Sequence, residues 1–266
     1  MSATSTISSA HGTSGDLPEA TASPPTTRTA EVVASALECD GVSRIEVAIT
    51  GPWRHRPGQV AQLSLAPGED GYFAIASAPN EAPRLTFLVR AGGSISPQLM
   101  ALTPGDDLSL SGPFGRGYEL AALTVSGRPN APPLLLVGVG TALGALRSAL
   151  VDALDNSPAR SITLVLGIRR PEELCFAEEM QSWGRRGVAI HIVASRGGPA
   201  WTGLVGHVQD HMPAIVDAVS RGGPPLCLIA GSEVFEDELT EHLIAAGVPS
   251  SAIQRNFRPD ARNLSA

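Results

Sequence analysis

The chain has 266 residues, a formal net charge of −7 and 43% hydrophobic residues, which suits a folded protein of one large or two medium domains. The acidic balance, without any basic block, argues weakly against nucleic acid as a partner, because Lys and Arg hold its phosphates. Cys39, Cys175 and Cys227 lie far apart without metal or cluster spacing. We therefore expect no metal, no iron–sulfur cluster on this chain, and a reduced, cytoplasmic setting.

Residues 1–28 are rich in Ser, Thr, Ala and Pro and lack hydrophobic periodicity, which predicts a disordered tail. They have no apolar segment of the secretory kind, and Asp16 and Glu19 argue against a transit peptide. The uncharged run 131–146 is short and rich in Gly and Pro, which favours a buried strand entering a helix over a membrane span.

Residues 29–125 carry a β pattern, in which short alternating or apolar segments are separated by Gly, Pro and Asp turns. This pattern predicts a six-stranded antiparallel β-barrel. A short helix is expected over Ser96–Leu102, before the last strand. The expected strands cover residues 30–38, 44–50, 58–66, 72–78, 84–90 and 106–112.

After a turn-rich boundary at 125–133, strands alternate with helices through 132–266, which predicts a doubly wound parallel sheet that binds a nucleotide. Pro171 suits the first turn of one helix, and Gly247 suits the stop of another. The expected strands are 133–138, 162–167, 188–195, 225–231 and 252–257, and the expected helices are 143–154, 171–186, 208–221 and 233–247.

The turn 138–142 follows the first buried strand of this second domain and opens a helix. Gly138 and Gly140 allow the backbone to approach a pyrophosphate closely, with Thr141 and Ala142 completing the turn. About half of such glycine turns serve packing alone, so both interpretations stand.

A second glycine-rich stretch precedes the short helix of the first domain. Gly93, Ser94, Ile95 and Ser96 are candidates for holding a second pyrophosphate. The competing interpretation is a hairpin loop with a capping serine.

In the first domain, three stretches resemble motifs of the ferredoxin–NADP reductase family. RPGQV (56–60) resembles its PGQ turn, YFAIASAP (72–79) its RxYSxAS flavin strand, and GPFGRGY (112–118) the end of its FAD-binding barrel. The resemblance implies that Phe73, Ala74, Ile75, Ala76 and Ser77 form a flavin wall. Gly71 stands at the family's Arg position and Ala74 at a Ser position, and Arg90 or Arg116 could supply the missing charge.

The second domain continues the resemblance, which covers residues 29–257 in all. GVGTALGALRS (138–148), LGIRRPEEL (166–174), WTGLVGHVQD (201–210) and IAGSEVFEDEL (229–239) resemble the family's nucleotide motifs in the same order.

The resemblance implies a nicotinamide-nucleotide site. The Ser195–Arg196 pair is similar to one that holds a 2′-phosphate, which leans slightly toward NADPH over NADH. Ala230 replaces the family's nicotinamide-side Cys. Phe257 is either a stacking aromatic or a core residue. The implied nucleotide residues are Gly138, Gly140, Thr141, Ala142, Arg169, Ser195, Arg196, His207, Gly231 and Phe257.

The resemblance implies an FAD-dependent NAD(P)H oxidoreductase, a monomer or homodimer without a membrane anchor, that passes electrons to an acceptor such as a ferredoxin. No side chain stands out as an acid or base. Two alternatives remain: a non-enzymatic reductase-like nucleotide-binding subunit, motivated by Gly71, Ala74 and Ala230, and an electron-transfer subunit serving a separate catalytic chain.

Overall fold

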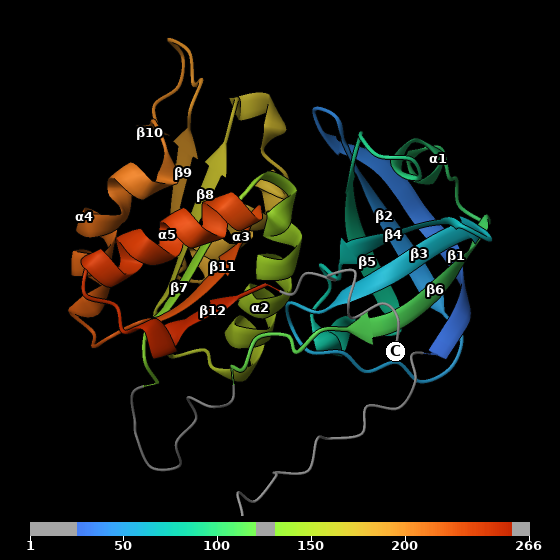
Figure 1. The fold of residues 1–266 in the computed structure, drawn as a ribbon, viewed down its shortest axis with the longest axis horizontal. Coiled ribbons are helices and arrows are strands. Elements are labelled where there is room, and N and C mark those ends of the chain that lie inside the picture. The colour runs from blue at the N-terminus through green and yellow to red at the C-terminus, as the bar shows by residue number, and fades with distance from the viewer. Residues whose placement is uncertain (1–25, 121–130, 257–266) are drawn as a thin grey trace, which may run out of the picture.

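The computed structural model describes residues 26–120 and 131–256, and these form two domains that lie side by side (Figure 1). The first domain is a six-stranded antiparallel sheet in the order β4-β3-β6-β1-β2-β5. Its elements are β1 (Thr26–Cys39), β2 (Val42–Ile49), β3 (Val60–Ala66), β4 (Glu69–Ala74), β5 (Arg84–Arg90), α1 (Ser96–Met100) and β6 (Asp107–Phe114).

Alternating side chains fill the interior of this sheet. In β2, Ile45, Val47 and Ile49 are buried while the residues between them are half-buried, as expected for a strand with one face on a core. The two ends of the strand order meet where the Ala76 amide donates to the Thr86 carbonyl at 2.8 Å. The predicted barrel is therefore confirmed.

The first strand begins earlier than expected. Thr26, Thr27 and Arg28 pair with Gly112, Ser111 and Leu110 of β6, so these three residues belong to the barrel. The rest of the predicted tail, 1–25, lies outside the described residues, as does the segment 121–130 between the domains.

The second domain is a parallel sheet in the order β10-β9-β8-β7-β11-β12. The crossover order confirms the doubly wound fold. Its elements are β7 (Leu134–Val139), α2 (Leu143–Asn156), β8 (Ile162–Ile168), α3 (Ala177–Arg185), β9 (Ala189–Ala194), β10 (Leu204–Val205), α4 (Val208–Ser220), β11 (Leu226–Ala230), α5 (Glu233–Ala245) and β12 (Ile253–Arg255).

The sequence of strand β7 is wholly apolar because both faces of the strand are covered. Leu134 and Leu136 belong to the core shared with α2 and α3, whereas Leu135 and Val137 belong to the core under α4 and α5. Helix α2 lies between the sheet and the barrel (Figure 1). No helix among the described residues is long and apolar enough to cross a membrane.

One helix begins later than its sequence indicates. Pro171–Glu173 forms only a short 3-10 turn, and α3 starts at Ala177 after Phe176, whose φ is +54°. The intervening Cys175 is tied to the first domain by a disulfide with Cys39. The prediction of one helix over 171–186 is therefore wrong. The expectation of reduced cysteines is also wrong for this pair.

Candidate functional site

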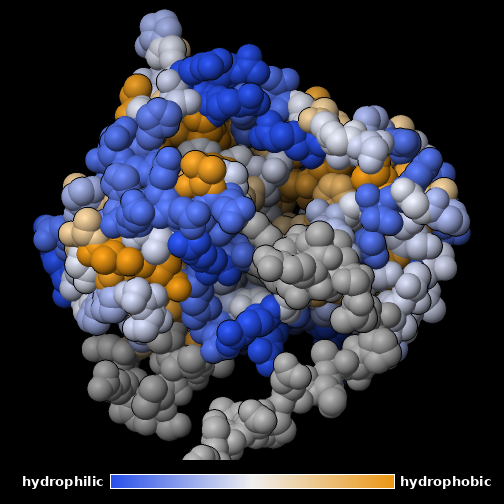
Figure 2. Space-filling model, in the orientation of Figure 1, coloured by the Kyte–Doolittle hydropathy of each residue, from blue (hydrophilic) through white to orange (hydrophobic). Residues whose placement is uncertain are grey.

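Two adjoining pockets lie where the barrel meets the carboxyl end of the parallel sheet, and Figure 2 shows a hollow between the two halves of the molecule. Their volumes are about 390 Å³ on the barrel side and about 500 Å³ on the nucleotide side, which is the range of small-molecule sites. Both are lined by Arg90, Val139 and Thr141. Two ligands bound here would therefore meet across these three residues.

The barrel-side pocket has an aromatic wall. Tyr72, Phe73 and Ala74 come from the end of β4, and Leu88 comes from β5. Tyr72 also contacts Phe114 edge-on, with ring centroids 5.5 Å apart. Burial, followed by the charge of Asp70, raises the pKa of Tyr72, so its ring stays neutral. The second domain closes this pocket with Ala142, Gly231 and Ser232.

Three residues expected in that wall lie behind it instead. Ile75, Ala76 and Ser77 are at most 1% exposed and line neither cleft pocket. Strand β4 ends at Ala74, after which Ile75 packs in the barrel core and Ala76 packs against α2. Tyr72, which the sequence analysis does not include among the site residues, takes their place in the wall.

The second domain holds this buried segment by its carbonyls. Arg147 donates to the Ala76 carbonyl at 2.8 Å, and the Ser148 hydroxyl donates to the Ser77 carbonyl at 2.6 Å. His55 Nε2 lies 3.0 Å from the same Ser77 oxygen. Both Arg147 and Ser148 come from α2, so the helix that opens at the glycine turn also positions the aromatic wall.

Arg147 is 8% exposed and lies between two carboxylates, Glu81 and Glu179, each at 2.9 Å. Its burial alone would lower its pKa, but the hydrogen bond to Glu81 and the two negative charges outweigh this and raise it. The guanidinium therefore stays charged, and it joins the barrel to α2 and α3.

Gly71 and the glycine-rich stretch lie together. A Cβ on Gly71 would stand 3.0 Å from Ile95 Cγ2 and 3.0 Å from Phe73 Cε2. The missing Arg is thus replaced by close packing of Ile95 on β4. Ile95 and Ser96 are buried, whereas Gly93 and Ser94 are exposed, so only the latter two present their backbone to solvent.

The two glycines of the turn have different roles. A Cβ on Gly138 would stand 2.7 Å from Leu146 Cδ1 and 2.9 Å from the Ala230 carbonyl, so Gly138 serves helix–strand packing. Gly140 has φ +53° and lines the nucleotide-side pocket, and its Cβ would stand 3.1 Å from Arg90 Nη2. Gly138 therefore serves packing, and Gly140 is the glycine that leaves room for a ligand.

Most predicted nucleotide residues converge on the nucleotide-side pocket. Arg169, Ser195 and His207 line it, but Arg196 does not. Gly231 lines the barrel-side pocket, and Phe257 lies outside the described residues. The residues missed by the sequence reasoning are Val139, Gly167, Ile168, Glu173, Val193, Gly206, Val208, Gln209 and Phe235. Val139, Gly167, Ile168 and Val193 carry a recognisable signal, which is a position at the carboxyl end of a parallel strand.

Arg90 is the cation at the junction. It ends β5, and no described residue forms a hydrogen bond or ion pair with its guanidinium. Its charge still acts on the carboxylate of Glu173. Burial alone would raise the pKa of Glu173, but the hydrogen bond from Arg169 and the charges of Arg169 and Arg90 lower it. A charged side chain without a partner in a cleft is suited to an anionic ligand.

Among the described residues there is no group of three or more His, Cys, Asp or Glu that could hold a metal. His207 and His211 stand four residues apart near the start of α4, and they belong to no such group among these residues. The cleft offers aromatic and arginine side chains, together with polar side chains such as Ser195 and His207.

The chain is similar to known oxidoreductases. Residues 136–241 match the oxidoreductase NAD-binding domain. A ferredoxin–NADP reductase B of Sorangium cellulosum is 34% identical over 54% of this chain and 57% of its own length. The ferredoxin–NAD(+) reductase component of an alkene monooxygenase system of Xanthobacter autotrophicus is 28% identical over 81% of this chain and 65% of its own. The chain thus spans less than two thirds of both relatives.

Solved structures share the whole two-domain arrangement. A cytochrome P450 reductase of Amycolatopsis superimposes with a TM-score of 0.77 and 22% identity, covering 88% of this chain and 70% of the other. A ferredoxin NADP+ reductase of Neisseria gonorrhoeae, solved with FAD and NADP, gives 0.69 and 15% identity, covering 87% and 99%. At these identities the likeness establishes the fold.

Proposed function

We infer that this protein, which belongs to the ferredoxin reductase-type family of FAD- and NAD-binding oxidoreductases, works as an NAD(P)H–flavin reductase that passes electrons to a partner. The observation that carries this proposal is the shared lining of the two cleft pockets by Val139 and Thr141. A flavin ring against Phe73 and a nicotinamide entering over the glycine turn would meet there.

The barrel-side pocket fits a flavin in spite of the replaced Arg. Tyr72 and Phe73 offer aromatic surface. The exposed Gly93 and Ser94 directly precede Ile95, which packs on Gly71 of β4. Arg90 lines the same cleft and brings a positive charge to it. We propose that Arg90 compensates for Gly71 by binding a phosphate, which is a charge-assisted contact worth about 1.5–3 kcal/mol.

FAD, when bound, would supply the redox chemistry by accepting a hydride from NAD(P)H and releasing electrons to the acceptor. The chain's own part is to align the two ligands. Val139 and Thr141 line both pockets where the two ligands would meet, and Arg147 and Ser148 fix the segment behind the wall. No described carboxylate or imidazole is placed for proton transfer in the barrel-side pocket.

NADPH is the proposed donor. Arg169 is 63% exposed and Ser195 lies in the same pocket, so together they offer a positive charge and a hydroxyl for a 2′-phosphate. Arg196 follows Ser195, and its amide donates to the Arg169 carbonyl at 2.7 Å. It therefore supports the loop from outside the pocket.

The acceptor is proposed to be a redox protein, by analogy with relatives named as ferredoxin reductases and oxygenase reductase components. The rival is a reductase-like protein that no longer binds FAD firmly. Gly71 favours this rival, because the residue that carries the phosphate-binding charge in the resembling motif is replaced by packing on Ile95.

Visible absorption of the purified full-length protein, with FAD added and excess removed, tests the proposal. Retained flavin bands that bleach anaerobically with NADPH, and more slowly with NADH, are the expected result. Protein that retains no flavin and oxidises no NADPH with excess FAD would leave the non-enzymatic rival. Equal bleaching with both nucleotides would reject only the NADPH preference.

A further inference from the structure

The Cys39–Cys175 pair joins the two domains beside the nucleotide-side pocket. Cys39 is the last residue of β1 in the barrel, and Cys175 lies between the 3-10 turn Pro171–Glu173 and α3. The bond spans 136 residues, with the two Cα atoms 5.4 Å apart, inside the usual range for a disulfide. Within the described residues it is the one covalent link between the domains besides the chain itself.

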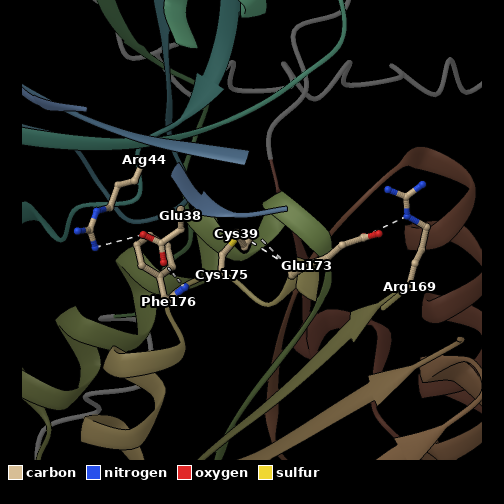
Figure 3. The surroundings of a disulfide bond; sticks show 7 residues. All are labelled: Glu38, Cys39, Arg44, Arg169, Glu173, Cys175 and Phe176. Carbon is tan, nitrogen blue, oxygen red and sulfur yellow. Dashed lines mark hydrogen bonds and ion pairs between the residues drawn. A yellow bond between two sulfur atoms is a disulfide. The ribbon is translucent and has the colours of Figure 1, made fainter. Parts of the chain in front are cut away.

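The pair leads directly to the nucleotide-side pocket through Glu173 (Figure 3). The backbone carbonyl of Glu173 lies 3.3 Å from Cys39 Sγ and 3.8 Å from Cys175 Sγ. Its carboxylate accepts from Arg169 Nε at 3.1 Å, and both residues line the pocket. The sulfur pair and the nucleotide site thus share one residue.

The pair also leads to the segment behind the aromatic wall. Phe176 follows Cys175, and its amide donates to the Glu38 carboxylate at 2.6 Å. The Arg147 guanidinium lies 5.2 Å from the centre of the Phe176 ring and donates to the Ala76 carbonyl. The loop Arg169–Phe176 is therefore connected both to the nucleotide-side pocket and to the segment behind the aromatic wall.

The surroundings suit both redox states. After reduction, each thiol has the Glu173 carbonyl as an acceptor. Noncovalent contacts would still hold the domains together, because the Asp40 amide donates to the Glu172 carbonyl and Asp40 pairs with Arg170 at 2.8 Å. Cys39 is 8% exposed and adjoins the exposed Asp40, so a small dithiol has a short path to it.

We propose that Cys39 and Cys175 form a reversible thiol–disulfide site that anchors the loop Arg169–Phe176 to the barrel and thereby tightens the nucleotide-side pocket. Oxidation by a peroxide removes one hydrogen from each thiol and joins the sulfurs, while hydrogen peroxide becomes two water molecules. Reduction by a dithiol returns two electrons and two protons, and the dithiol closes to its own disulfide. The effect on nucleotide binding rests on the proposed function, whereas the anchoring does not.

The first test counts thiols in the denatured full-length protein. Peroxide-treated protein should have one free thiol, Cys227, and dithiothreitol-treated protein should have three. Cys227 is a suitable internal reference, since burial raises its pKa to about 12 and keeps it unreactive in the folded chain. Three free thiols after peroxide treatment would overturn the proposal.

The second test follows hydrogen exchange of folded protein in both redox states. Peptides covering 169–176 should exchange about threefold faster or more after reduction, while peptides from β7 stay unchanged. Cys39→Ser/Cys175→Ser should match the reduced protein with or without dithiothreitol, and Cys227→Ser should respond like the wild type. Equal exchange in the two states would overturn the anchoring, with or without any variant.

NADPH titration provides the third readout. Reduction should raise the dissociation constant about fivefold or more, and the double serine variant should show the raised value in both states. If NADPH binds in neither redox state, the proposed function is wrong. The hydrogen-exchange measurement then still tests whether the disulfide anchors the loop. Faster exchange with an unchanged constant would overturn the coupling to the pocket.

Discussion

The hydroxyl of Tyr118, at the end of the barrel, donates a hydrogen bond of 3.0 Å to the carbonyl of Ile229 in β11. The ring also packs against the PGQ turn, because a Cβ on Gly58 would stand 2.5 Å from it. Burial, followed by the charge of Glu236, raises the pKa of Tyr118 well above its usual value. One neutral side chain therefore connects a barrel turn to the central part of the parallel sheet.

Tyr118→Phe should lower the free energy of unfolding by about 0.5–1.5 kcal/mol, the net worth of one neutral hydrogen bond. The loss stays in this range because the Ile229 carbonyl keeps the amide of Asn256 as a second donor at 3.0 Å. Urea unfolding measures it. Tyr72→Phe is the matched control, since no described residue bonds its hydroxyl. Equal midpoints for both variants would contradict the role of the Tyr118 bond.

Gly140→Val should abolish measurable NADPH binding while leaving the protein folded. The backbone there has φ +53°, and a Cβ at this position would stand 3.1 Å from Arg90 Nη2, so a branched side chain displaces Arg90 and fills the turn. Isothermal titration measures the binding. Gly68→Val is the control, because Gly68 also has a positive φ, of +81°, but nothing lies within 4 Å of its Cβ. Equal weakening by both variants would point to general strain.

The strand pattern made the fold predictable. Apolar runs such as that of β7 and alternation such as that of β2 report directly which faces are covered. The glycine turn was equally visible, because a buried strand that enters a helix leaves amides free at one place. Within the turn, however, the sequence could not separate Gly138, which packs on Leu146, from Gly140, which faces the pocket.

The misses share a physical cause, which is contact between the domains. Ile75 to Ser77 follow the alternation of a strand, but Ile75 packs in the barrel core, and α2 binds the carbonyls of Ala76 and Ser77. The helix expected from Pro171 is interrupted where Cys175 bonds to a residue 136 positions away. Such pairings depend on how two domains meet, and neither local propensity nor spacing reports that geometry.

Arg90→Gln should weaken binding of FAD, of NADPH or of both by about one to two decades, as expected for the loss of one charge-assisted contact of about 1.5–3 kcal/mol. The glutamine keeps a similar length and removes the charge. Titrations of each ligand measure the effect, and its decrease at high salt would confirm a charge contribution. Arg116→Gln is the control, because that side chain is 89% exposed and pairs outside the pockets. Unchanged affinity for FAD would reject Arg90 as the cation that compensates for Gly71, whatever the effect on NADPH.

His55 should make the protein less stable in acid. The imidazole is 7% exposed, accepts from Trp53 Nε1 at 3.1 Å on Nδ1 and contacts the Ser77 carbonyl through Nε2. Burial lowers its pKa, although the Ser77 carbonyl and Glu81 oppose the shift. Because the unfolded chain then binds a proton more readily than the folded one, this group's contribution to the free energy of unfolding is full above its unfolded pKa of about 6.5 and falls as the pH drops below it.

The loss of unfolding free energy between pH 7.5 and pH 5, measured by urea denaturation, should therefore be smaller in His55→Gln than in the wild type, even though the variant starts from a lower stability at pH 7.5. His242→Gln, on the exposed face of α5, should keep the wild-type slope. A His55→Gln protein whose stability falls as steeply with acid as the wild type would show that His55 titrates alike in the folded and unfolded chain. Burial behind the aromatic wall would then not keep the imidazole neutral.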